Sequence, residues 1–199
     1  MIALLAALLT PPALGSDGEP VWSEAEALRI AHDLQSFAAR NAWEAVEEGY
    51  TDLEDLGMPI DADLHELGAE AARNRGDAWT AYQRLVKVLA AGVDPSSGAH
   101  GHMATYRDQY GRVVVRRVEI TPIALVPETA PFQPDFRLAI AFAAAQLDQE
   151  GAFDGLLPAG TYVLGEGRTF EVVPGLTPTV VQREVGDGAQ VKKKKKNKD

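Results

Sequence analysis

Apolar residues recur every three or four positions through the first half of the chain, which is the spacing of one face of an α-helix. This pattern predicts four helices between residues 22 and 92, with Gly57 and Gly76 at two of the breaks. Between the first two segments only Asn41 could cap a helix, so two helices or one long helix both fit there. The apolar faces of the four segments carry Ile30 and Leu34, Trp43 and Tyr50, Leu64 and Leu67, and Trp79 and Tyr82.

The third and fourth segments together contain a sequence motif of a helical repeat. In the stretch LGAEAARNRGDAWTAYQRLVKVL, Leu67-Gly68 lies in the first helix, Gly76-Asp77 supplies a turn, and Ala81 comes early in the second helix. The stretch resembles one tetratricopeptide repeat, a pair of antiparallel helices of about 34 residues. The resemblance covers residues 27–91 and implies helical hairpins that bind a protein partner in a groove.

The match departs from the repeat in several places. The first copy, around Ala31, Ala45 and Tyr50, has neither the leucine-glycine pair nor the turn glycine. The second copy has one extra residue before Gly76, and its proline comes late, at Pro95. An unrelated antiparallel helical bundle has the same amphipathic spacing and is the alternative.

The pattern changes after residue 92, where residues 93–104, with the stretch VDPSSGAHGH, predict a linker. A smaller α+β domain is then predicted over residues 105–182. The β-branched stretch YGRVVVRRVEITPIALV predicts strands interrupted at Pro122. In GTYVLGEGRTFEVVPG, apolar residues alternate on both sides of Gly165-Glu166-Gly167, which predicts a β-hairpin.

Residues 136–150 fit two structures. Phe136, Leu138 and Ile140 alternate as in a strand, but the high alanine content, with Asp135 and Gly151 at the ends, favours a helix. We predict the helix. The fold class is then α+β, with N-terminal antiparallel helical hairpins over residues 22–92, followed by a small C-terminal domain with a β-hairpin and one helix.

The composition is that of a folded protein. Of the 199 residues, 46% are apolar, which suffices for one domain with a core or for two small domains. No cysteine is present, which excludes disulfides, thiolate metal ligands and cysteine nucleophiles. The sequence contains no glycine-rich phosphate loop, and we expect no cofactor.

The first residues, MIALLAALLTPPALGS, form an uncharged apolar run that ends in small residues of the kind a signal peptidase recognises. We interpret residues 1–15 as a signal peptide cleaved near Gly15 or Ser16, and we expect an extracytoplasmic protein, periplasmic or secreted. The run is shorter than the ~20 apolar residues of a membrane-spanning helix, so we expect no transmembrane segment in the mature chain.

Charge is distributed unevenly along the chain, whose net charge is −10. Residues 17–89 hold 16 acidic and 6 basic residues, and residues 90–190 hold 12 and 7. An acidic body without a basic face argues against nucleic-acid binding. Residues 186–199 are basic and predict a disordered, solvated tail, with weak contact to an anionic surface as the alternative. Its lysines are Lys192, Lys193, Lys194, Lys195, Lys196 and Lys198.

His100 and His102 are the strongest candidates for a metal site. Two histidines separated by one residue project to the same side of an extended chain and could share a divalent metal with Asp94 or Asp108. A polar, glycine-rich loop that holds histidines without any ligand is the simpler interpretation. We therefore expect no metal.

Four large aromatic residues of the helical half, Trp43, Tyr50, Trp79 and Tyr82, are the candidate partner-binding residues. Most such residues pack between helices, but one or two could line a groove that receives a peptide. The sequence thus predicts an exported, noncatalytic interaction or scaffold module of the cell envelope that binds a protein partner through its helical half. The alternatives are an extracytoplasmic metal-dependent hydrolase using the two histidines and a surface-associated structural protein tethered by the lysine tail.

Overall fold

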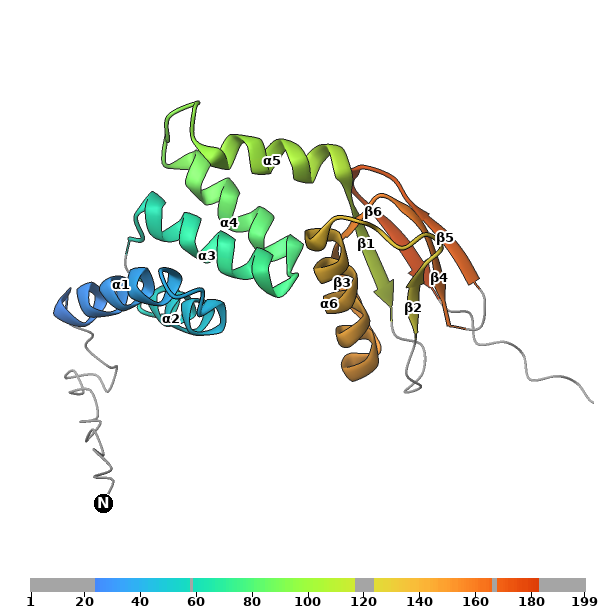
Figure 1. Cartoon of the computed structure of the whole chain (residues 1–199), viewed down its shortest axis with the longest axis horizontal. Helices are drawn as coiled ribbons and strands as arrows, with labels where there is room; N and C mark the ends of the chain where they lie inside the picture. Colours follow the sequence, from blue (N-terminus) through green and yellow to red (C-terminus); the bar gives the residue numbers. More distant parts are fainter. Residues whose placement is uncertain (1–23, 58, 117–123, 166–167, 183–199) are drawn as a thin grey trace, which may run out of the picture.

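The computed structural model describes residues 24–57, 59–116, 124–165 and 168–182 (Figure 1). Five helices precede the first described strand, which confirms the predicted α+β layout. The predicted signal peptide and the lysine tail lie outside the described residues. The first five helices are α1 (Glu24–Ala38), α2 (Trp43–Asp55), α3 (Ala62–Arg75), α4 (Ala78–Ala90) and α5 (Gly98–Gln109).

Two tight turns separate α1 from α2 and α3 from α4. Asn41 adopts a positive φ of 55° after α1, so two helices form there rather than one long helix. Gly76 ends α3 with a φ of 87°, a conformation that favours glycine. The carboxylate of Asp77 then accepts a hydrogen bond from the backbone N–H of Thr80 at 3.0 Å and caps α4. The predicted turn at Gly76-Asp77 is confirmed.

Helices α2 and α3 approach closely because Gly68 has no side chain. A Cβ atom at Gly68 would lie 2.5 Å from Cδ2 of Tyr50, so the tyrosine ring packs directly on the backbone of α3. Tyr50 is completely buried at this contact. The buried residues of the surrounding cluster are Ile30, Leu34, Val46, Tyr50, Leu53 and Ala71.

Helix α5 occupies most of the linker that the sequence predicts at residues 93–104, which corrects that prediction. The Ser97 hydroxyl caps the helix by accepting a hydrogen bond from the backbone N–H of Ala99. Ala99, Met103 and Tyr106 are buried, at spacings that place them on one face of the helix. In the stretch GAHGH only Ala99 is buried, and the glycines and histidines lie on the exposed face of the helix. The buried stripe is therefore difficult to recognise in the sequence.

The second half of the described chain contains the strands and one further helix. They form two three-stranded sheets with the orders β3-β1-β6 and β2-β4-β5. Strands β4 and β5 pair antiparallel, with Tyr162 opposite Phe170, so the predicted hairpin is confirmed. The elements are β1 (Tyr110–Arg116), β2 (Leu125–Pro127), α6 (Pro134–Glu150), β3 (Phe153–Pro158), β4 (Gly160–Leu164), β5 (Arg168–Val172) and β6 (Gly175–Gln182).

The helix predicted at residues 136–150 is confirmed as α6. Ala139, Ile140, Ala143 and Leu147 are buried at helical spacing, and Gly151 closes the helix with a φ of 69°. Helix α6 packs on strands β2 and β3 and also contacts α3. It therefore lies between the helical half and the strands (Figure 1).

The two halves of the chain share a core cluster. Aromatic rings follow one another from α4 to α6: Tyr82 to Tyr106 at 6.3 Å, Tyr106 to Tyr110 at 5.1 Å, and Tyr110 to Phe136 at 5.2 Å between centroids. Leu156 of β3 belongs to the same cluster. Because α5 continues directly into β1, no linker separates the halves at this point.

The contact of Gly68 with Tyr50 predicts the effect of a substitution. Gly68→Ala is expected to lower the free energy of unfolding by about 1–3 kcal/mol, because its methyl group collides with the buried ring. Gly101→Ala, inside α5, is the matched control, since no atom outside its own stretch of helix lies within 4 Å of an added Cβ. Denaturant unfolding measures both variants. Equal stability of the two would contradict the packing of Tyr50 on α3.

Candidate functional site

The four aromatic candidates belong to the core clusters and do not share one groove. Tyr50 is completely buried and Tyr82 is 7% exposed, so neither can anchor a partner, which corrects the prediction for these two residues. Trp43 is half-buried against the cluster of α1 and α2, and Trp79 is half-buried against the cluster shared by the two halves. Helical spacing cannot separate these cases, because a core residue and a groove residue both lie on the apolar face of a helix.

Trp79 connects α4 with a sheet of the second half. Its ring stacks on Tyr82 with the centroids 5.7 Å apart, and the guanidinium carbon of Arg112 lies 4.6 Å from the Trp79 ring centroid. Arg112, in β1, also pairs with Asp154 of β3 at 3.2 Å. The cation–π contact and the ion pair together hold the indole against the β3-β1-β6 sheet.

A charged network lies between α2, α3 and α4. Arg84 is 4% exposed and donates hydrogen bonds to the two carboxylate oxygens of Glu47 at 2.5 and 2.9 Å. It also donates to the carbonyl oxygen of Gly68 at 2.8 Å, and its guanidinium lies 4.1 Å from the centroid of the Tyr50 ring. The buried charge is thus paired and hydrogen-bonded, as the stability of such a group requires.

Tyr50 and His65 extend this network toward the surface. Burial raises the pKa of Tyr50, so its hydroxyl stays protonated, and this hydroxyl forms a hydrogen bond with Nδ1 of His65 at 2.6 Å. Burial lowers the pKa of His65 below its usual value of 6.5, the positive charges of Lys87 and Arg84 add to this effect, and Glu54 opposes it. The lowered pKa favours the neutral imidazole of His65 at pH 7.

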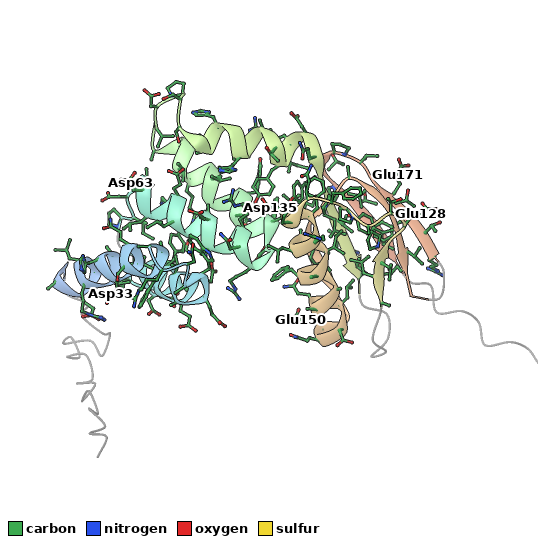
Figure 2. The ribbon with its side chains drawn as sticks, in the orientation of Figure 1. Asp33, Asp63, Glu128, Asp135, Glu150 and Glu171 are labelled. Atoms are coloured by element: carbon green, nitrogen blue, oxygen red, sulfur yellow. The ribbon has the colours of Figure 1, made fainter. Side chains whose placement is uncertain are left out.

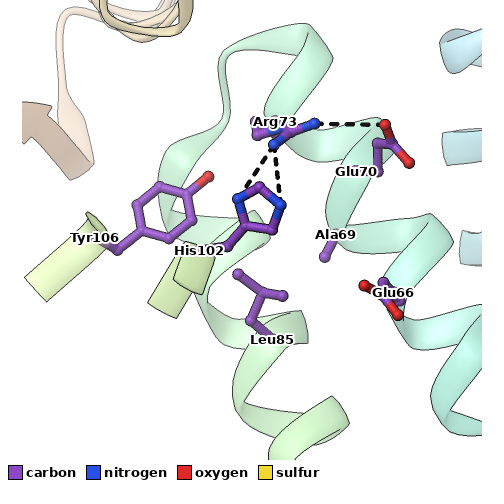
Figure 3. Close-up of a pocket in the computed structure, with 7 residues that line it drawn as sticks. All are labelled: Glu66, Ala69, Glu70, Arg73, Leu85, His102 and Tyr106. Atoms are coloured by element: carbon purple, nitrogen blue, oxygen red, sulfur yellow. Dashed lines mark hydrogen bonds and ion pairs between the residues drawn. The ribbon is translucent and has the colours of Figure 1, made fainter. Parts of the chain in front are cut away.

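A small hollow of about 70 Å³ opens between α3, α4 and α5 (Figure 3). Nη1 of Arg73 lies 3.3 Å from both ring nitrogens of His102, and Nη2 pairs with Glu70 at 3.4 Å. Figure 3 shows the guanidinium between these two side chains. A hollow of this size has room for water rather than for a metabolite, whose pockets measure about 300 Å³ or more. The lining residues are Glu66, Ala69, Glu70, Arg73, Leu85, His102 and Tyr106.

The structure separates the two predicted metal ligands. His100 and His102 lie in a helix instead of an extended loop, and side chains two residues apart on a helix do not share a face. His102 faces the guanidinium of Arg73, whose positive charge disfavours a bound cation. Among the described residues, no three or more histidine, aspartate or glutamate side chains form a group that could hold a metal ion.

A second hollow opens between α1, the end of α2 and the start of α3. Its volume is about 170 Å³, and seven of its eight lining residues are apolar. Leu28 of α1, one of these residues, is 65% exposed. A cavity of ~150 Å³ lined by apolar side chains can hold benzene, so this hollow can receive one large apolar side chain. The lining residues are Ala27, Leu28, Ala31, Leu53, Pro59, Ile60, Asp61 and Leu64.

The sequence contains only one feature that points to this apolar hollow, the position of Leu28. Leu28 lies beside the buried stripe of α1, which contains Ile30 and Leu34. Single exposed leucines are common on protein surfaces, so this sign alone has little weight. The opposite wall comes from Leu53 and from four residues between 59 and 64, which only the folded chain brings next to α1.

No protein-family model, curated protein or solved structure matches this chain. The tetratricopeptide resemblance therefore stays a prediction that rests on the residues quoted above. Within the part of the chain that the structure describes, no helix is both long enough and apolar enough to span a bilayer.

The lowered pKa of His65 predicts pH-dependent stability. The unfolded chain binds a proton on this histidine more readily than the folded protein does. The stabilising contribution is therefore complete above pH 6.5 and is lost as the pH falls from 6.5 through the folded-state pKa. We expect the free energy of unfolding, measured in denaturant at a series of pH values, to decrease over this interval, and to decrease less in a His65→Gln variant.

His32→Gln is the matched control for this measurement. His32 is exposed on α1, so its replacement is expected to leave the wild-type pH profile in place. A His65→Gln variant whose stability declines as steeply as that of the wild type would show that another group is responsible.

Proposed function

We propose that this protein is an exported, noncatalytic interaction module of the cell envelope that binds a protein partner through its helical half. The observation that carries this proposal is the apolar hollow between α1, α2 and α3, with Leu28 exposed at it. Helix α1 packs on both α2 and α3, so alternate helices lie side by side. Tetratricopeptide arrays, which bind partners through such helical surfaces, share this arrangement.

The hollow offers a partner a favourable contact. Burying a leucine completely is worth about 1.5–3 kcal/mol relative to leaving it in water. A partner side chain that fills the hollow would cover Leu28 and lose its own hydration at the same time. Protein interfaces gain most of their affinity from a few buried anchors of this kind.

Several side chains that catalysis could use have structural partners instead. Arg84 is bound by Glu47, and His65 forms a hydrogen bond with Tyr50. Arg73 is held by Glu70 and lies against a histidine of α5. These contacts favour a noncatalytic role over the hydrolase alternative. The lysine tail of the third alternative lies outside the described residues.

Export is expected from the apolar run of residues 1–15. We expect the protein recovered outside the cytoplasm to begin near Gly15 or Ser16, as determined by mass spectrometry of its N-terminal peptide. A control with Leu4→Arg and Leu8→Arg should remain in the cytoplasm uncleaved, because the apolar run is interrupted. Recovery of a protein that still begins at Met1 from the extracytoplasmic fraction would contradict the signal-peptide interpretation.

Partner binding is tested by a charge placed in the hollow. Leu28→Asp is expected to reduce the cross-linked recovery of specific partners from envelope extract about tenfold, as the loss of one buried apolar anchor predicts. The bait is the mature protein, and quantitative mass spectrometry measures recovery. Val86→Asp is the matched control, since Val86 is 44% exposed on α4 and does not line the hollow.

The two variants should have the same circular dichroism spectrum and unfolding midpoint, which removes misfolding as a cause. Identical recovery with Leu28→Asp and Val86→Asp would rule out the hollow as the partner-binding surface.

A further inference from the structure

We propose that the apolar hollow receives a cationic amphipathic segment of the partner, with one apolar side chain in the hollow and basic side chains along α3. This inference rests on the proposed function and specifies the class of partner. The first reason is the charge of the helices that form the hollow. Residues 24–75, which span α1 to α3, contain 13 acidic residues and 4 basic residues.

The basic residues of these helices are largely neutralised inside the protein. Three of the four arginines pair with carboxylates, while Arg40 bonds to Ser36. A negative potential therefore remains over the surface of α1 to α3. The pairs are Arg29 with Glu26 at 2.5 Å and with Asp33 at 2.9 Å, Arg73 with Glu70 at 3.4 Å, and Arg75 with Glu47 at 3.7 Å.

Acidic side chains of α3 lie next to the hollow. Asp61 lines it from the N-cap position of α3 and makes no side-chain capping hydrogen bond. Asp63 is exposed, and Figure 2 shows it at the start of α3, away from the strands. Glu66 follows three residues later, on the same face of the helix. Within the described part of the chain, these three carboxylates take part in no ion pair.

Asp63, Glu66 and Glu70 follow one another along α3 at spacings of three and four residues, on a stripe beside the apolar hollow. Asp61 and Leu64 line the apolar hollow, whereas Glu66 and Glu70 line the hollow that contains Arg73. Helix α3 has 14 residues, which corresponds to about 21 Å at 1.5 Å per residue. A partner segment of similar length could therefore place one apolar residue in the hollow and basic residues against the carboxylates that follow. An acidic segment would be repelled by the same carboxylates.

The test uses the full mature chain and two labelled synthetic peptides of about 14 residues, a length set by the helix rise. Both peptides have leucine at the same helical positions. One has lysine at every polar position, and the other has glutamate. Fluorescence anisotropy at low salt is expected to show the leucine-lysine peptide binding at least about tenfold more tightly than the leucine-glutamate peptide, with the difference shrinking as salt screens the charges.

Charge variants locate the binding. The combined variant Asp61→Asn, Asp63→Asn and Glu66→Gln is expected to weaken binding of the leucine-lysine peptide about tenfold. The matched control, Glu128→Gln, Asp148→Asn and Glu150→Gln, removes three exposed acids of the second half and changes the net charge equally. It should change the affinity less than about twofold, because these acids lie in α6 and directly after β2 and line neither hollow of α3.

Leu28→Gln tests the apolar contact without any change of charge. It should also weaken the binding of the leucine-lysine peptide about fivefold. Equal affinity for the two peptides, equal effects of the two triple variants, or binding that is insensitive to Leu28→Gln would each overturn the inference. None of these results would alter the recovery of partners with Leu28→Asp and Val86→Asp, which decides the proposed function separately.

Discussion

The packing of the helical half depends on the buried guanidinium of Arg84. It joins α4 to the carboxylate of Glu47 on α2 and to the backbone of α3 at Gly68, and it lies over the ring of Tyr50. A buried charge that loses its partner typically costs about 3–5 kcal/mol, so α2, α3 and α4 keep one relative position. The absence of a side chain at Gly68 allows the ring to lie on the α3 backbone, and the carbonyl oxygen of the same residue accepts the hydrogen bond from the guanidinium.

The second constraint is the cluster that the two halves share. Tyr106, Tyr110 and Phe136 connect α5, β1 and α6, and Trp79 adds a contact with Arg112 of the sheet. These contacts bury the inner side of the helical half against α6 and the strands. Helices α1 and α2 lie at the end of the molecule far from the strands (Figure 1), and the apolar hollow lies at this end. The proposed binding surface is thus separate from the junction.

Charge and apolar contact would have different roles at this surface. The acidic excess of α1 to α3 acts over about one screening length, roughly 8–10 Å in physiological salt, and favours encounter with a basic segment. The apolar hollow acts only on contact, because hydrophobic stabilisation requires the removal of surface from water. Specificity would then come from the shape of the hollow, to which Leu28 and Leu64 both contribute.

The sequence by itself determined the four N-terminal helices, the later helix and the β-hairpin that follows it. Local signals define the turn at Gly76-Asp77, the helix after Gln133 and the β4-β5 hairpin, because caps, left-handed glycines and alternation act over a few residues. The sequence left undecided which apolar residues are buried and which charged side chains form ion pairs. Tyr50 became a core residue, the histidines of GAHGH became part of a helix, and Leu53 and Leu64 came to lie beside Leu28 only through tertiary packing. These outcomes depend on contacts between residues far apart in the chain, which no local pattern records.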